Sequence, residues 1–141
     1  MKEANDFKTE SDALYRVMKD LSDADFREST QFKGWTLNDV LEHLHMWNWA
    51  ANESYVNENS FSTFIGMVMS ETKGGSLKPF ERKWIDGLYG RDLLETWREF
   101  YNNMALTFEN VDPKMRLKWA GPSMSARSSI SARLMETWAH G

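Results

Sequence analysis

Residues 34–55 read GWTLNDVLEHLHMWNWAANESY, and this stretch contains the strongest fold signal in the chain. Thr36 is a favourable N-cap residue, and Asp39 three positions later gives a pattern that resembles a capping box with Asp in place of Glu. After this start signal, apolar side chains recur every three or four residues, which predicts a long amphipathic helix over residues 37–55. Its predicted buried stripe consists of Leu37, Val40, Leu41, Leu44, Trp47, Asn48 and Ala51.

Three more segments show the same helical spacing of apolar residues, over residues 11–21, 91–110 and 128–141. Four amphipathic helices with little strand pattern predict an all-α fold, an antiparallel four-helix bundle formed by one domain over residues 1–141. The inward-facing residues of the last helix are predicted to be Ile130, Leu134, Thr137 and Trp138.

The segments between these helices differ in composition. Residues 61–69 are apolar enough for a short helix, although Gly66 lies in its middle. Residues 71–90 contain four glycines and Pro79, which predicts a long connection that crosses over between the second and third major helices. Residues 115–127 are predicted to be extended or irregular. Three basic residues of the long connection are predicted to lie in a solvated loop: Lys78, Arg82 and Lys83.

The composition narrows the classes of function. The 141 residues include no cysteine, which excludes disulfides, thiolate metal ligands and a cysteine nucleophile. Seventeen basic and 21 acidic residues give a formal net charge of −4, which argues against nucleic acid and anionic membranes as partners. The N-terminal sequence MKEANDFKTE lacks the apolar core of a signal peptide, and no apolar run is long enough to span a membrane. A soluble, cytoplasmic protein is therefore expected.

Two of the three histidines are placed so that they could share a site with an acidic residue. His43 lies at the edge of the apolar stripe of the helix over residues 37–55, whereas His45 points about 160° away from it, since each residue turns a helix by about 100°. Glu136 and His140 are four residues apart and share one face of the last helix. A Glu–His pair on one helix and a histidine from a neighbouring helix form a suitable facial set for a divalent metal. Such ligands suit zinc first, and also nickel, manganese or ferrous iron, and three protein ligands leave a position open for water or substrate.

A purely structural reading of the same residues also stands. A Glu and a His four residues apart on a helix commonly form a solvated pair worth a few tenths of a kcal/mol. A single histidine at the edge of an apolar stripe is often only a half-buried polar residue. Spacing alone leaves both readings open.

Two motifs carry a resemblance to a known family. The segment Gly34–Leu44 is similar to the pattern GWT-x-x-D-V-x-x-H-L, and Arg133–Gly141 is similar to R-L-x-E-T-W-x-H-G. Both patterns occur in the DinB/YfiT-like superfamily of metalloenzymes, and in particular in the N-terminal domain of mycothiol-dependent maleylpyruvate isomerases. The segment Trp119–Ala126 resembles an uncharacterised actinobacterial branch of that family.

The resemblance implies a fold, a metal site and a reaction class. It implies a helical bundle whose divalent metal is held by His43, Glu136 and His140. It also implies a thiol-dependent transferase or isomerase that acts on a small molecule, with a thiolate or water on the metal as nucleophile. The low-molecular-weight thiol, of the mycothiol type, would come from a separate molecule. The alternative is a non-catalytic bundle that dimerises or binds a ligand and keeps a vestigial metal site.

Two further expectations concern the C-terminus of the chain and its oligomeric state. In the family, the last helix continues beyond its His-Gly pair and a second domain often follows, whereas this sequence stops at Gly141, so a chain truncated at its C-terminus is expected. The apolar surface that so short a bundle leaves exposed also makes a homodimer plausible.

Four other residues are candidates for supporting roles around the site. Asp39, one turn before His43, could hold an imidazole in orientation. Trp47 could wall a pocket, and Arg133 could bind a substrate carboxylate through two parallel hydrogen bonds or only pair with Glu136 or Asp39. Arg127 lies in a serine-rich stretch at the start of the last helix, where an anion could bind, although serines there commonly act as caps.

Overall fold

In the computed structural model, which describes residues 1–31 and 33–140, helix α2 spans Leu37–Val56. The predicted capping box is present. The Thr36 hydroxyl accepts a hydrogen bond from the Asp39 amide, and the Asp39 carboxylate accepts one from the Thr36 amide, both at 3.0 Å. These bonds satisfy amides that the first turn of a helix otherwise leaves without partners. The predicted start of this helix is confirmed, and its predicted end differs by one residue.

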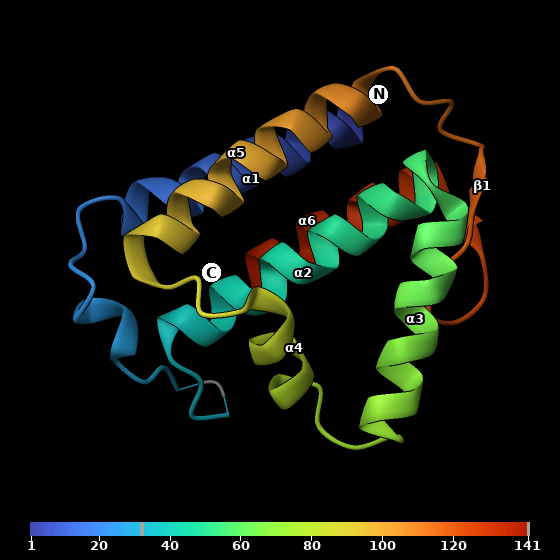
Figure 1. Ribbon diagram of the computed structural model, residues 1–141. Coiled ribbons are helices and arrows are strands. Elements are labelled where there is room, and N and C mark those ends of the chain that lie inside the picture. Colours follow the sequence, from blue (N-terminus) through green and yellow to red (C-terminus); the bar gives the residue numbers. More distant parts are fainter. Residues whose placement is uncertain (32, 141) are drawn as a thin grey trace.

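Four helices form a bundle around one apolar core (Figure 1). Helix α1 (Lys2–Met18) packs against α5 (Gly90–Glu109) and α6 (Ala126–His140), and α2 packs against the same two helices. Each helix turns an apolar face to this core because its apolar residues recur at helical spacing. The predicted all-α bundle is confirmed. The large side chains buried in the core include Phe7, Leu41, Leu44, Trp97, Tyr101 and Phe108.

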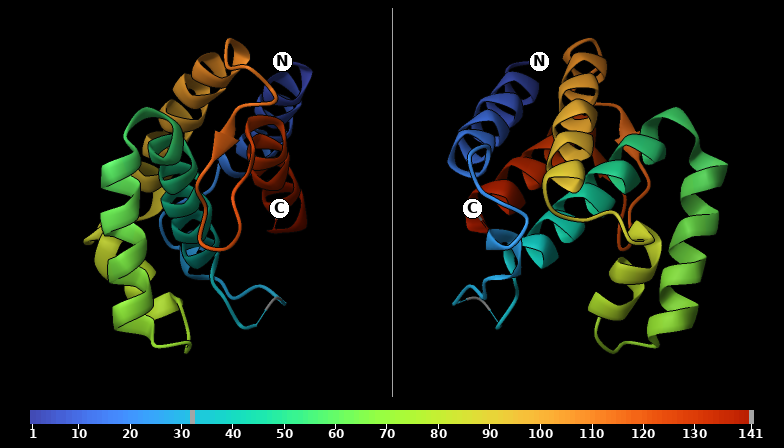
Figure 2. Two further views of the ribbon diagram at one scale, coloured as in Figure 1. Left: turned by 90° about the vertical axis from the view of Figure 1, so that its right-hand side faces the viewer. Right: turned by 60° about the vertical axis from the view of Figure 1, so that its left-hand side comes forward.

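The connections give the bundle a crossover. Helices α1 and α2 are antiparallel, as are α5 and α6, whereas α2 and α5 run in the same direction (Figures 1 and 2). The chain returns from the end of α2 to the start of α5 through α3 (Glu58–Thr72) and α4 (Lys78–Ile85), which both pack against α2. The predicted crossover is confirmed. The sequence predicts a long connection with a few ordered turns over residues 71–90, and α4, of eight residues, is the ordered part in its middle.

Two details of the helices also differ from the prediction. Helix α1 begins well before the expected start at Ser11, because Ala4 and Phe7 continue its buried stripe toward the N-terminus. Trp138 is 65% exposed and does not face inward. Thr137, the preceding residue, lies on the buried face of α6, and a helix turns the next side chain well away from that face.

The remaining elements are short. The strands β1 (Arg116–Leu117) and β2 (Met124–Ser125) pair antiparallel between α5 and α6, within the segment predicted to be extended. A 3₁₀-helix, η1 (Asp25–Arg27), lies between α1 and α2. No helix among the described residues is long and apolar enough to cross a membrane. The arrangement places the C-terminal end of α6 beside the first turns of α2 (Figure 1).

Candidate metal centre

The structure brings together the three predicted ligand residues where α6 ends beside α2. His43 projects from the second turn of α2, and Glu136 and His140 project from the last turns of α6. The Nε2 atom of His43 lies 3.3 Å from Oε2 of Glu136, and the Nε2 atom of His140 lies 2.9 Å from the same oxygen. One ligand atom from each of the three residues lies within 4.8 Å of the other two. Gly141, the last residue of the C-terminal motif, lies outside the described residues.

This donor set fits a divalent cation. Zinc binds imidazole nitrogen and carboxylate oxygen at about 2.0–2.2 Å, which separates neighbouring ligands of a tetrahedral ion by about 3.4 Å. The two separations from Glu136, 2.9 and 3.3 Å, lie just below this value, so small side-chain movements would suffice to surround an ion. Nickel, manganese and ferrous iron accept the same ligands. The residues present therefore fit the metal that the sequence suggested.

A buried carboxylate that sequence analysis missed holds His43 in place. Glu81, on α4, is fully buried, and its Oε2 atom lies 2.7 Å from Nδ1 of His43. The same oxygen accepts a hydrogen bond of 3.0 Å from Nε1 of Trp47, and Nζ of Lys78 lies 2.8 Å from Oε1. A carboxylate at Nδ1 fixes the orientation of the ring and directs Nε2 toward the ligand cluster.

The position of Glu81 corrects two expectations. Asp39 does not contact the imidazole, because its carboxylate caps α2 and lies 3.3 Å from the Arg82 guanidinium. Lys78 is not in a solvated loop, since it is only 7% exposed and its Nζ lies 4.2 Å from the centroid of the Trp35 ring. The sequence did contain a signal for this helix: Pro79 lies in its first turn, and apolar residues recur at helical spacing in Phe80, Trp84 and Ile85.

Of the other proposed supporting residues, Trp47 and Arg133 lie at the site and Arg127 does not. Trp47 lines a pocket beside His43. Arg133 lines the same pocket, and its Nε donates a hydrogen bond of 3.2 Å to Asn48 Oδ1; among the described residues it forms no ion pair with an acidic side chain. Arg127 pairs with Glu3 of α1 at 3.1 Å. It precedes Glu136 by nine residues, which is about 13 Å along a helix, so it does not reach the cluster.

The hydrogen bonds of the cluster determine the pKa values of its groups. The hydrogen bond with His43 is the main reason that the pKa of Glu136 falls to about 2. Burial lowers the pKa of His43, but hydrogen bonds to Glu136 and Glu81 outweigh it and raise this pKa overall. Burial and the charge of His43 lower the pKa of His140. At neutral pH, Glu136 is therefore an anion and His140 a neutral imidazole, which are the forms that bind metals.

Two pockets meet at the ligand cluster, and His43, Leu77 and Glu136 line both of them. The larger pocket has a volume of about 490 Å³ and is also lined by His140 and by Trp35, whose ring stacks on the His140 imidazole at a centroid distance of 5.7 Å. The smaller pocket has a volume of about 250 Å³. A small molecule in either pocket would therefore contact the candidate ligands.

His45 lies in a different part of the interior. Its ring packs between Trp84 and Phe100, at centroid distances of 5.8 and 5.5 Å, and burial lowers its pKa to about 4. The prediction that only one of the two neighbouring histidines reaches the cluster agrees with this geometry.

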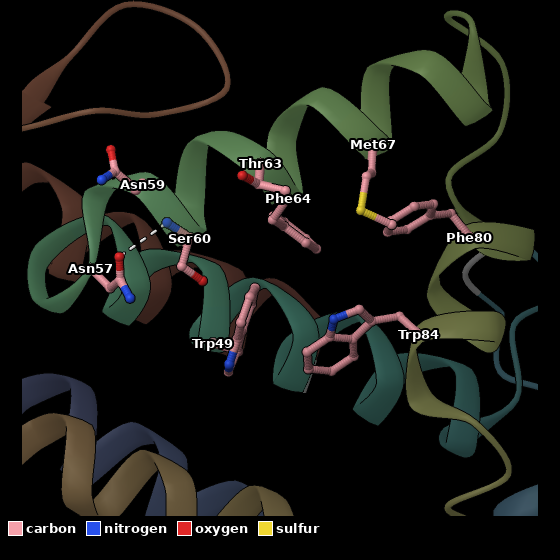
Figure 3. A pocket seen from close by; sticks show the side chains of 9 residues that line it. All are labelled: Trp49, Asn57, Asn59, Ser60, Thr63, Phe64, Met67, Phe80 and Trp84. Atoms are coloured by element: carbon pink, nitrogen blue, oxygen red, sulfur yellow. Dashed lines mark hydrogen bonds between the residues drawn. The ribbon is translucent and has the colours of Figure 1, made fainter.

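A third pocket, of about 480 Å³, lies between α2, α3 and α4 (Figure 3). The indoles of Trp49 and Trp84 and the side chains of Met67 and Phe80 surround it. Its other lining residues are Phe64 and small polar residues, and none of the nine is an acid or a base. This pocket offers no group that could activate a nucleophile, so the candidate site remains the histidine and glutamate cluster.

Comparisons with known proteins agree with the two sequence motifs. Residues 7–141 match the family described as the mycothiol maleylpyruvate isomerase N-terminal domain. Two proteins of Mycobacterium tuberculosis, one from strain CDC 1551 and one from strain H37Rv and both described as uncharacterized, are each 29% identical to this chain over 136 residues. The match covers 96% of this chain but 52% of each relative, so the chain spans about half the length of these curated relatives. No solved structure matches the chain significantly. On the family match over nearly its whole length, the chain belongs to the mycothiol maleylpyruvate isomerase N-terminal domain family.

Proposed function

We propose that this chain is a divalent-metal-dependent domain that acts on a small molecule, with a low-molecular-weight thiol of the mycothiol type or water as the nucleophile. The observation that carries the proposal is the convergence of two imidazoles and one carboxylate, from α2 and α6, at the place where two pockets meet. The family name, which contains both mycothiol and an isomerase, supports a thiol-dependent transferase or isomerase.

A cation at this point would acidify a thiol or a water molecule that binds to it. A bound divalent ion lowers the pKa of a thiol or water that it holds, so a nucleophile forms near neutral pH. The chain contains no cysteine, so the thiol has to come from a separate molecule. Both pockets are large enough for part of such a molecule.

The residues of the chain prepare the site for this task. Glu81 holds the His43 ring through a buried polar contact and is itself paired with Lys78, so little reorganisation is needed when a ligand binds. The Trp35 ring stacks on His140, and Leu77 lines both pockets, so both apolar side chains lie beside the candidate ligands. Glu136 supplies the negative charge that balances part of the charge of a cation.

A cobalt substitution tests this proposal. The metal-stripped chain is loaded with one equivalent of Co²⁺, mycothiol is added, and the absorption spectrum is recorded. We expect a sulfur-to-cobalt charge-transfer band that S-methylated mycothiol does not produce, because thiolate ligation requires a free thiol. The band should be absent from a His43→Phe variant.

The outcomes separate the alternatives. Cobalt binding without a thiolate band would contradict the thiol-dependent reaction and leave water as the nucleophile. A chain that binds no cobalt would favour a non-catalytic bundle with a vestigial site. The same band in the His43→Phe variant would contradict the assignment of His43 as a ligand.

A further inference from the structure

Arg133 is buried with most of its hydrogen-bonding capacity unused. The residue is 4% exposed, and its guanidinium donates one hydrogen bond, from Nε to Oδ1 of Asn48 at 3.2 Å. Its Nη2 atom has no hydrogen-bond partner among the residues that the structure describes, and no described carboxylate lies within ion-pairing distance of the guanidinium. A guanidinium offers five N–H donors and remains charged in proteins.

Asn48, the hydrogen-bond partner of Arg133, also has a buried donor without a partner among the described residues. Asn48 is fully buried, and after it accepts the bond from Arg133 its own Nδ2 atom has no partner among the described residues. Between them the two side chains therefore have more donors than acceptors, and their two unpartnered atoms are both donors. Burying unpaired donors and an uncompensated charge is costly, and buried groups of this kind call for a ligand, an ion or water that satisfies them.

The surroundings of Arg133 indicate which ligand fits. The pocket of about 250 Å³ that Arg133 lines is walled by the apolar side chains of Leu77, Trp119 and Ala132 and by the Trp47 ring, and His43 and Glu136 also line it. A molecule that occupies this pocket would meet a cationic donor, an apolar wall and the candidate metal ligands. The carboxylate of Glu136 faces the same space, which disfavours a dianion such as phosphate relative to a singly charged group.

We propose that Arg133, supported by Asn48, is the carboxylate subsite for a small and otherwise apolar acid that occupies this pocket. A carboxylate supplies acceptor oxygens for the Arg133 guanidinium, which lines the pocket and which Asn48 holds from behind, and guanidinium–carboxylate pairs are among the stronger hydrogen-bonded contacts in proteins. The apolar part of the acid packs against Trp47 and Trp119 and extends toward His43. That this acid is the substrate rests on the proposed function, whereas the anion subsite itself does not require a metal.

Titration of the metal-free chain with benzoate, followed by NMR, tests the subsite. Benzamide is the control ligand, because it has nearly the same shape and no charge. We expect benzoate to shift the indole N–H signals of Trp47 and Trp119 in a saturable way and to bind about tenfold more tightly than benzamide, which is the effect of one charge-assisted hydrogen bond.

Two variants test whether Arg133 causes the preference for benzoate over benzamide. Arg133→Met keeps the length of the side chain without its donors, so it should bind benzoate about as weakly as benzamide. Arg127→Met, on the exposed start of the same helix, should keep the wild-type preference. The melting temperature of Arg133→Met should be equal to or higher than that of the wild type, since replacing a poorly paired buried charge by an apolar group is commonly neutral or stabilising.

Three results would overturn the subsite. Equal affinity for benzoate and benzamide would show that the pocket does not recognise the charge and that water satisfies Arg133. Unchanged benzoate binding by Arg133→Met would place the anion elsewhere. A large loss of stability in that variant, together with an unchanged ligand preference, would show that Arg133 has a structural role only. The benzoate and benzamide titrations use the metal-free chain with a chelator in the buffer. None of these results therefore depends on the outcome of the cobalt experiment.

Discussion

At the scale of single residues, the orientation of His43 depends on Glu81. The carboxylate of Glu81 contacts the ring nitrogen that faces away from the ligand cluster, and it is fully buried, so no water can replace it without rearrangement. This contact connects α4, an element outside the four-helix bundle, to the candidate metal centre on α2 and α6.

Glu81→Gln should weaken zinc binding by about 10- to 100-fold, the usual effect of losing the partner that orients a ligating imidazole. The neutral amide is a poorer acceptor for the N–H of His43 and leaves Lys78 without its nearest counter-charge. Competition with a chromophoric chelator measures the affinity. Glu71→Gln, which removes only an exposed pair with Lys83, is the matched control. Equal zinc affinity in Glu81→Gln and Glu71→Gln would contradict the orienting role.

His45 should make the protein sensitive to acid. Burial lowers its pKa from 6.5 to about 4, so between these values the unfolded chain binds a proton that the folded chain does not. Stability is therefore lost as the pH falls from about 6.5 to about 4, by about 3 kcal/mol in total from this residue. His45→Phe, which keeps an aromatic ring beside Trp84 and Phe100, should remove this part of the pH dependence.

Urea unfolding at pH 7 and at pH 4.5 measures the effect. Other groups also titrate in this range, so the informative quantity is the difference between His45→Phe and the wild type in how much free energy of unfolding is lost on acidification. An identical loss in the two proteins would show that His45 is not buried in its neutral form.

The convergence of the three candidate ligand residues could be predicted from the sequence, whereas the contacts that support them could not. His43, Glu136 and His140 follow from helical spacing and from two motifs, because neighbouring turns of a helix determine which side chains share a face. Glu81 is 38 residues from His43. Their contact depends on how α4 packs against α2, which no local pattern encodes. For the same reason, the sequence did not show that Arg133 contacts Asn48 rather than an acidic residue.

At the scale of elements, the start of α2 was better predicted than the short helix α4. The start of α2 has a complete capping box, a local signal that uses only the residues beside it. Helix α4 has eight residues, too few to be stable alone, and is held by tertiary contacts such as the bond from Lys78 Nζ to the Asp39 carbonyl oxygen. Such contacts depend on the packing of α4 against α2, so the sequence predicted a long connection with a few ordered turns over residues 71–90 and not the bounds of this helix.

The N-cap of α2 should make a measurable contribution to the free energy of unfolding. Thr36→Ala removes the side-chain acceptor of the Asp39 amide and should lower the free energy of unfolding by about 1 kcal/mol. Thr107→Ala is the control, because the Thr107 hydroxyl bonds only to a carbonyl of its own helix and alanine is a better helix former. Denaturant unfolding of both variants tests this. A Thr36→Ala variant no less stable than Thr107→Ala would contradict the role of the cap.

At the scale of the whole molecule, the candidate ligands join two helices that are far apart in the sequence. His43 lies near the start of α2 and Glu136 near the end of α6, 93 residues apart. A cation bound by both helices is bound by the folded chain and only weakly by the unfolded one, so it stabilises the fold.

Zinc should therefore raise the melting temperature of the chain. At a free zinc concentration about 100 times the dissociation constant, the expected stabilisation is about 2.7 kcal/mol. Thermal unfolding followed by circular dichroism, with and without zinc, measures the shift. The Glu136→Gln variant, which loses the central carboxylate of the cluster, should show little of it. A similar shift in both proteins would assign the effect to zinc bound elsewhere.

The most direct test of the account is the metal content of two matched variants of α2. The chain is purified without an affinity metal, stripped with a chelator, dialysed against zinc and analysed by mass spectrometry of its elements, as wild type, His43→Phe and His45→Phe. We predict about one zinc per chain for the wild type and for His45→Phe, and less than about a tenth of an equivalent for His43→Phe. Equal zinc content in the two variants, or no zinc in the wild type, would contradict the proposed metal centre.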